Sequence, residues 1–174
     1  MKTIVPNKEN VIKLMNGKVG DKPIIMVNLL RFNEKADYTG VEKNHVDYGK
    51  DCSGRRAYKS YSKEVIKLLW EVGGQILWLG NVRDSLIIPE HESWDEVALV
   101  YYPSREAFKR MVTSDAYQQI VHHRSAALDD SRLIETKAQR LPKMILSAAK
   151  GAFRLKSLFK PKIGDVNVGA LDSL

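Results

Sequence analysis

The sequence has almost no cysteine and no long hydrophobic run. Cys52 is the one cysteine among 174 residues, so an internal disulfide cannot form, and this usage is typical of a reducing compartment. No run of about 18 apolar residues is present, as a membrane-spanning helix requires. The opening stretch, MKTIVPNKEN, lacks the apolar core of a secretory signal. These absences predict a cytoplasmic protein that does not span a membrane.

The sequence also lacks the short motifs of several enzyme classes. It contains no G-x-G-x-x-G, Walker loop, G-x-S-x-G, H-E-x-x-H or C-x-x-C, so nucleotide cofactors and serine-hydrolase chemistry are unsupported. His45 and His91 lie far in sequence from the pair His122 and His123. A metal site would need three separate loops to converge, so we expect neither a metal nor a cofactor.

The net charge of +7 is concentrated in one segment. Residues 137–162 hold eight basic residues and no acid, so the rest of the chain, with 20 basic and 21 acidic residues, carries a formal charge of −1. No aromatic interleaving accompanies the basic residues, so we expect no nucleic-acid partner. The pattern predicts a nearly neutral domain at residues 1–137 and a basic extension at 138–174.

Apolar periodicity predicts a mixed order of helices and strands within the domain. In chain order these are a helix at 7–17, an apolar strand at 24–30, a loop at 33–55, an amphipathic helix from Ala57 to Gly73, strands at 75–80 and 97–102, a capped helix from Ser104, a helical run from Asp115 to Leu128, and a closing strand with Leu133 and Ile134. The last two helical runs form one kinked helix or two, and Asp129 and Asp130 break the helical pattern. A loop as long as 33–55, with scattered Tyr38, His45 and Tyr48, points mildly to binding.

This order contains β-α-β-β-α-β, the ferredoxin-like plan of an α+β protein. It predicts a four-stranded antiparallel sheet with both main helices on one face. We expect Met26, Trp78, Val100 and Tyr102 on the other face. Because an apolar face of that size is rarely left to water, a second copy of the sheet or the basic extension should cover it.

Four segments resemble the domain of unknown function 1330 family, a branch of the dimeric α+β barrel superfamily. They are MVNLLRF, YKSYSKEVIKLLWEVGGQILWLG, WDEVALVYYPSREAF and SDAYQQIVHHRSAALDDSRLI, within residues 23–137. The resemblance implies a homodimer with a ligand pocket between helices and sheet in each protomer. Small monooxygenases, polyketide cyclases and muconolactone isomerases belong to the same superfamily. Positions that resemble the branch's recurrent residues are Asn28, Arg31, Tyr61, Gly74, Trp78, Trp94, Asp95, Tyr117, His123 and Arg124.

The candidate catalytic residues are His122, His123 and Arg124. On a helix, one imidazole can face inward while its neighbour faces about 100° away. A buried imidazole beside an aromatic pocket suits acid/base work on an enol or phenol, whereas packing or surface positions are the alternative. Arg124 is expected either to bind a ligand carboxylate or to pair with Asp95 or Glu96.

The candidate ligand-binding residues surround the predicted pocket. They are Asn28, Arg31, Tyr61, Trp78, Tyr102 and Tyr117. Asn28 is a polar amide inside an apolar strand, so it contacts either a ligand or nearby backbone groups. We expect a small, largely apolar organic ligand and an acid/base enzyme of the isomerase, cyclase or monooxygenase type that needs no cofactor.

The basic extension supports an alternative of another class. From Pro142 to Lys160 an apolar band alternates with basic residues, as in a helix that lies on an anionic membrane or packs on a partner. The residues expected to make such contacts are Lys143, Lys150, Phe153, Arg154, Lys156 and Phe159. On this interpretation the protein is a non-catalytic interaction protein, peripheral at the membrane.

Overall fold

The computed structural model describes residues 3–16 and 22–137. Its elements are α1 (Lys8–Asn16), β1 (Ile24–Phe32), α2 (Gly54–Glu71), β2 (Gln75–Asn81), β3 (Glu96–Tyr102), α3 (Arg105–Thr113), α4 (Asp115–Ala127) and β4 (Leu128–Thr136). The predicted basic helix and its membrane or partner contacts lie outside the described residues. The division at residue 137 therefore stays a prediction.

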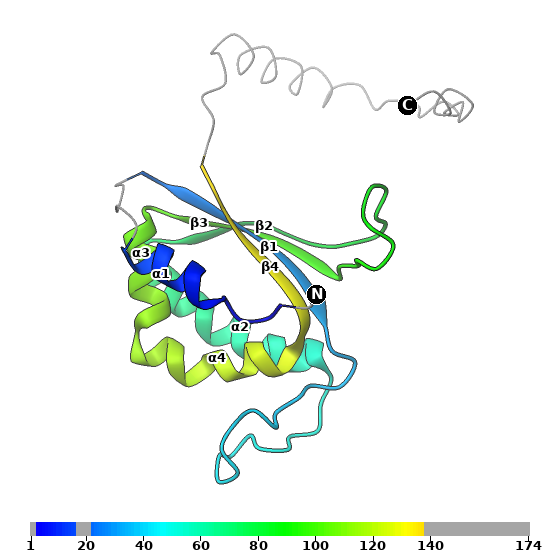
Figure 1. The fold of residues 1–174 in the computed structure, drawn as a ribbon. Helices are drawn as coiled ribbons and strands as arrows, with labels where there is room; N and C mark the ends of the chain where they lie inside the picture. The colour runs from blue at the N-terminus through cyan, green and yellow to red at the C-terminus, as the bar shows by residue number, and fades with distance from the viewer. Residues whose placement is uncertain (1–2, 17–21, 138–174) are drawn as a thin grey trace, which may run out of the picture. The chain divides into compact units, whose positions relative to one another are not determined.

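The four strands form one antiparallel sheet in the order β2-β3-β1-β4. The helices α2, α3 and α4 lie on the same side of this sheet, as Figure 1 shows. With the element order β-α-β-β-α-α-β, this topology is the ferredoxin-like α+β fold, and it confirms the predicted four-stranded antiparallel sheet.

Side-chain caps determine where the helices begin and end. The Ser53 and Ser104 side chains accept hydrogen bonds from the backbone N–H groups of Arg56 and Ala107, and Gly73 adopts a positive φ of 77° just after α2. Ser114 is both the last cap of α3 and the first cap of α4, with an extended ψ of 146°. The helical pattern after Ser104 is therefore two helices, not one with a kink.

The helix-facing side of the sheet holds residues that we expected on the other side. Met26 and Tyr102 are buried in a cluster with Leu69, Phe108 and Met111, and Val100 packs against it. The prediction for Met26, Val100 and Tyr102 was wrong. Alternation divides each strand into two sets, but in β1 and β3 both sets are apolar, so the pattern cannot tell which set the helices cover.

The outer face of the sheet, away from the helices, is also apolar. Strand register places Ile25, Val27, Leu29, Trp78, Val97, Leu99, Tyr101 and Ile134 on this outer face. A register shift between Ile76 and Trp78 brings Trp78 opposite Leu99. The side chains of Trp78 and Ile134 are 52% and 48% exposed. Trp78 therefore lies on an apolar outer face, as expected. Its neighbours there are not the expected Met26, Val100 and Tyr102 but residues such as Leu99.

The last strand begins earlier than the pattern predicts. Leu128 is the first residue of β4, and Asp129 and Asp130 lie inside the strand. Arg31 forms ion pairs with both carboxylates, at 2.7 and 3.6 Å. The two aspartates look like a break in sequence, but paired with a cation from β1 they fit a strand.

Among the described residues, no helix is long and apolar enough to cross a membrane.

Candidate functional site

The long loop between β1 and α2 folds back onto the end of α4. Backbone N–H groups of Asn33 and Asp37 donate to the carbonyls of Ala127 and Ala126, at 2.8 and 2.9 Å, and Ala36 N–H donates to Cys52. The loop residues Tyr38 and Asp47 are buried, with 2% and 8% of their surface exposed. The loop therefore brings polar groups against α4.

Five side chains meet there, and we call them the histidine cluster: Tyr38, His45, Asp47, His122 and His123. Asp47 Oδ2 lies 3.1 Å from His122 Nε2 and 3.7 Å from His123 Nε2. The Tyr38 hydroxyl lies 2.8 Å from His123 Nδ1. The two neighbouring imidazoles have ring centroids 4.0 Å apart. Both imidazoles lie near the one carboxylate of Asp47, because the loop wraps closely around α4.

Two residues at the rim complete the surroundings of Asp47. Lys50 Nζ lies 2.7 Å from Asp47 Oδ1, on the carboxylate oxygen opposite the imidazoles. The Asp47 backbone N–H donates to His45 Nδ1 at 3.1 Å, and the His45 ring lies 4.8 Å from that of His122. The side chains of Lys50 and His45 are 46% and 39% exposed, so the cluster has a solvent-facing edge.

The environment sets the charges in the cluster. Burial opposes ionisation of Asp47, but hydrogen bonds from Lys50 and His122 outweigh it and lower the pKa of Asp47 to about 2. Burial and the neighbouring His122 lower the pKa of His123, while burial raises the pKa of Tyr38 to about 12. At neutral pH the cluster therefore holds an ionised carboxylate, a neutral His123 and a protonated phenol. Tyr38 then donates to His123 Nδ1, and the Nε2 hydrogen faces Asp47.

The same groups offer ligand atoms for a metal ion. His45, Asp47 and His122 place one such atom each within 4.8 Å of one another. Two segments of the chain, not three loops, supply this set. His91, by contrast, lies on the exposed connection between β2 and β3.

Arg124 and Arg31 belong to a different network. Arg124 donates to the Ile4 carbonyl at 2.8 Å and to Ser131 Oγ at 3.2 Å. The expected partners of Arg124, Asp95 and Glu96, lie instead beside Arg55.

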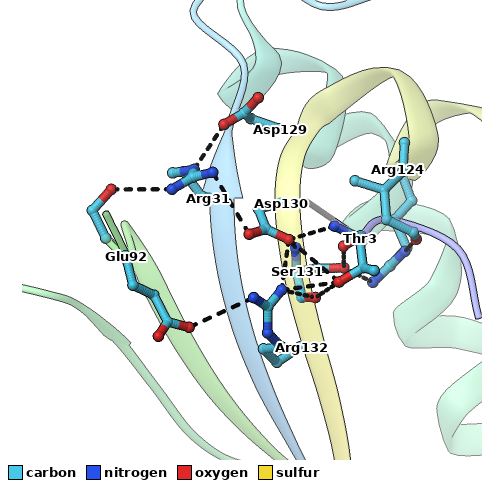
Figure 2. Close-up of polar contacts among 10 residues, drawn as sticks. Thr3, Arg31, Glu92, Arg124, Asp129, Asp130, Ser131 and Arg132 are labelled. Atoms are coloured by element: carbon cyan, nitrogen blue, oxygen red, sulfur yellow. Dashed lines mark hydrogen bonds and ion pairs between the residues drawn. The ribbon is translucent and has the colours of Figure 1, made fainter. Parts of the chain in front are cut away.

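The N-terminal segment takes part in this network too. Asp130 accepts hydrogen bonds from the Thr3 backbone N–H at 2.7 Å and from Arg132 at 2.6 Å, while Arg31 lies between Asp129 and Asp130 (Figure 2). These contacts attach the N-terminal segment to the edge strand β4. Arg31 and Arg124 therefore stabilise the fold, and their hydrogen bonds and ion pairs do not involve the imidazoles of the histidine cluster.

The predicted ligand-binding residues do not form one set. The Tyr61 and Tyr117 hydroxyls lie 3.4 Å apart between α2 and α4, and Tyr102 contacts Met111 Sδ at 3.9 Å in the core. Asn28 donates to the backbone carbonyls of Met26 and Ala98, at 3.3 and 3.5 Å. Trp78 lies on the outer face. The tyrosines and Asn28 therefore share the helix side of the sheet, and Trp78 does not.

Sequence reasoning did not select the loop half of the cluster. Tyr38 and His45 stood out only as scattered residues of a long loop, and Asp47 and Lys50 were not considered as site residues. A signal was nevertheless present: a His-x-Asp-x-x-Lys segment, His45 to Lys50, in a loop too long for a simple connection. No local pattern shows that this segment meets α4.

The fold and the cluster together define a class: a ferredoxin-like α+β protein with a histidine–aspartate–tyrosine cluster between a long loop and a helix. The model of a domain of unknown function, DUF1330, matches residues 50–136. This match covers half of the chain, and the chain belongs to that family. The predicted membership is confirmed.

Comparison with solved structures finds proteins similar to this chain. A protein of unknown function from Rhodopseudomonas palustris, RPA0582, is 32% identical with a TM-score of 0.71, and the alignment covers 81% of this chain and all of that one. Its methylated form is 33% identical with a TM-score of 0.70, over 80% and 96% of the two chains. A dimeric ferredoxin-like protein of unknown function from Bacteroides fragilis is 8% identical with a TM-score of 0.40, over 69% and 99%. The search of the curated proteins finds no match.

Proposed function

We propose that this protein binds a small, largely apolar organic ligand at the histidine cluster and transfers a proton to or from it. The observation that carries this proposal is the position of His123. Its imidazole lies between the Tyr38 hydroxyl at Nδ1 and the Asp47 carboxylate near Nε2. The hydrogen bond at Nδ1 gives the imidazole a defined orientation, as general acid/base catalysis requires, and Nε2, beyond hydrogen-bond distance of Asp47, is the nitrogen left to exchange a proton with a ligand.

The exposure of the imidazoles supports access by a ligand. The side chains of His122 and His123 are 17% and 15% exposed, so each is packed but reaches the surface. Lys50 and His45 lie at the same edge and offer positive or polar groups to an anionic end of a ligand. A ligand that carries a carboxylate matches this edge of the cluster.

Keto–enol isomerisation is the simplest reaction that such a cluster can support. The enol hydroxyl loses a proton to a base while the adjacent carbon gains a proton from an acid, so atoms and electrons balance without an oxidant or an organic cofactor. His123, with Tyr38 behind it, is proposed as the group that moves the proton. His122 and Asp47 orient it.

We propose further that two chains pair through the outer face of the sheet. Its apolar residues, with Trp78 half exposed, give this surface the composition of an interface. Arg124 is not assigned to catalysis in this proposal, because its hydrogen bonds go to the N-terminal segment and β4.

The test is the enol–keto conversion of phenylpyruvate, followed by the loss of enol absorbance. We expect the wild-type chain to accelerate it, and His123→Gln to reduce the rate by about a hundredfold, as removal of a general acid/base typically does. His91→Gln is the matched control, since that side chain lies outside the cluster. A wild-type rate equal to that of buffer, or an unchanged rate in His123→Gln, would contradict the proposal.

A further inference from the structure

The geometry points to a divalent transition-metal site formed by His45, Asp47 and His122. The three residues offer ligand atoms within 4.8 Å of one another. Two come from the loop and one from α4, so a bound ion would join the two segments. This inference goes beyond proton transfer, and it does not require that the protein be an enzyme.

The distances lie close to those of a coordinated ion. Zinc binds imidazole nitrogen and carboxylate oxygen at about 2.0–2.2 Å, which places neighbouring ligand atoms of a tetrahedral site about 3.3–3.5 Å apart. His122 Nε2 and Asp47 Oδ2 are already 3.1 Å apart. His45 Nδ1 is 3.9 Å from the same oxygen. The ligand atoms of His45 and His122 lie within 4.8 Å of one another, so a movement of His45 by up to about 1.3 Å would complete a set with tetrahedral spacing.

His45 is the ligand that is able to move. Its side chain is 39% exposed and lies on a turn, whereas Asp47 and His122 are packed. The Asp47 N–H donates to His45 Nδ1, so this lone pair already points into the cluster. An ion bound through Nδ1 would replace that N–H.

The two oxygens of the Asp47 carboxylate face different groups. Oδ1 accepts the hydrogen bond of Lys50 at 2.7 Å, and Oδ2 faces the imidazoles. A carboxylate that ligates through one oxygen and accepts a hydrogen bond at the other is the usual arrangement around metals. The Lys50 charge opposes a dication, so it limits the affinity without blocking the site.

The ligand types indicate which ions fit. Two imidazoles and one carboxylate suit zinc, nickel, cobalt or iron(II), with the remaining positions left to water or an organic ligand. Magnesium and calcium prefer sites built from oxygen, so we expect them to be rejected. His123 stays outside the set, since Tyr38 holds its Nδ1.

Metal titration of the tag-free full-length chain tests the inference. After treatment with a chelator, calorimetry with Zn²⁺ and Ni²⁺ should show one site, and Mg²⁺ should show none. Visible absorption of bound Co²⁺ provides a second measurement. We expect His45→Gln and His122→Gln to weaken Zn²⁺ binding more than tenfold. Loss of a residue that only hydrogen-bonds to a ligand already weakens metal binding by about 10- to 100-fold, and loss of a ligand should weaken it at least as much.

The chain offers matched controls because it has four histidines in all. His91→Gln should bind Zn²⁺ as the wild type does, and Lys50→Gln should bind it more tightly. His123→Gln should keep metal binding while it loses proton transfer, which separates this inference from the proposed function. The inference is overturned if the wild type does not bind Zn²⁺, or if His45→Gln binds it unchanged. Because the His45 side chain is 39% exposed and lies on a turn outside the helices and strands, the His45 variant should keep the wild-type circular dichroism spectrum.

Discussion

The Asp47 carboxylate lies 3.1 Å from the Nε2 atom of His122, although the two residues are 75 positions apart in the chain. This contact joins the long loop to α4 and completes the histidine cluster. Asp47 also receives the Lys50 ammonium, so its charge is compensated within a nearly buried position. The loop is therefore attached to the fold at residues of the histidine cluster.

Replacing Asp47 should loosen this attachment. Asp47→Asn keeps the shape of the side chain but removes the negative charge to which Lys50 and His122 are hydrogen-bonded. Hydrogen bonds to a charged group contribute about 1.5–3 kcal/mol each. We expect the free energy of unfolding, measured by urea denaturation, to fall by about 1–3 kcal/mol. Asp51→Asn is the control, since that side chain is 81% exposed and should change stability little. Equal effects of both variants would contradict this account of the loop.

Arg124 should matter for stability more than for chemistry. Its guanidinium holds the Ile4 carbonyl and Ser131 Oγ, and loss of both contacts in Arg124→Gln should cost about 1–3 kcal/mol of unfolding free energy. The rate of phenylpyruvate conversion by the folded fraction should stay within about twofold of the wild-type rate. A large fall in rate with unchanged stability would instead place Arg124 in the catalytic site.

The Asp130 network should make stability depend on pH. Burial favours the neutral acid, but hydrogen bonds from the Thr3 backbone and from Arg132 outweigh it and lower the pKa of Asp130 below its ordinary value of 3.8. A carboxyl group whose pKa is lower in the folded chain stabilises the fold above its unfolded pKa and loses this effect as pH falls. The stability difference between wild type and Asp130→Asn should therefore be full at pH 6 and shrink below about pH 4. Urea denaturation at both pH values measures it, and a difference that grows in acid would refute the argument.

Trp78 should control self-association. A carboxylate on the outer face would be buried without a partner in the dimer but would stay hydrated in the monomer. Trp78→Glu should therefore convert the proposed dimer into a monomer. Light scattering after gel filtration gives the mass directly. Trp70→Glu is a matched control, because Trp70 is 66% exposed and lies on α2, away from that face. A monomeric wild type would end the dimer proposal.

The fold was largely predictable from the sequence, because apolar periodicity and caps act over short distances. The amphipathic pattern from Ala57 to Gly73 reproduces most of α2, and the predicted helix at 7–17 contains α1. Two features were not predictable in this way. The helix-covered side of β1 is ambiguous because both of its faces are apolar. Asp129 and Asp130 lie in a strand with partners that include Arg31, about a hundred positions away, and no local pattern shows this pairing.

Only half of the candidate site could be predicted. His122 and His123 attract attention as neighbours on one helix, whereas Asp47 and Tyr38 lie in a segment without periodicity. Their roles depend on how the loop closes on α4, and loop closure leaves no repeating signal in the sequence. A long polar loop that contains histidine, aspartate and tyrosine shows where to look, but not which contacts form.

The most direct test of the central claim uses nitrogen-15 NMR of the four imidazoles in the wild-type chain. Addition of phenylpyruvate to the ion-free protein should shift the ring nitrogens of His122 and His123 and leave those of His91 in place. Shifts confined to His91, or none at any histidine at saturating phenylpyruvate, would contradict the claim that the histidine cluster is the ligand site.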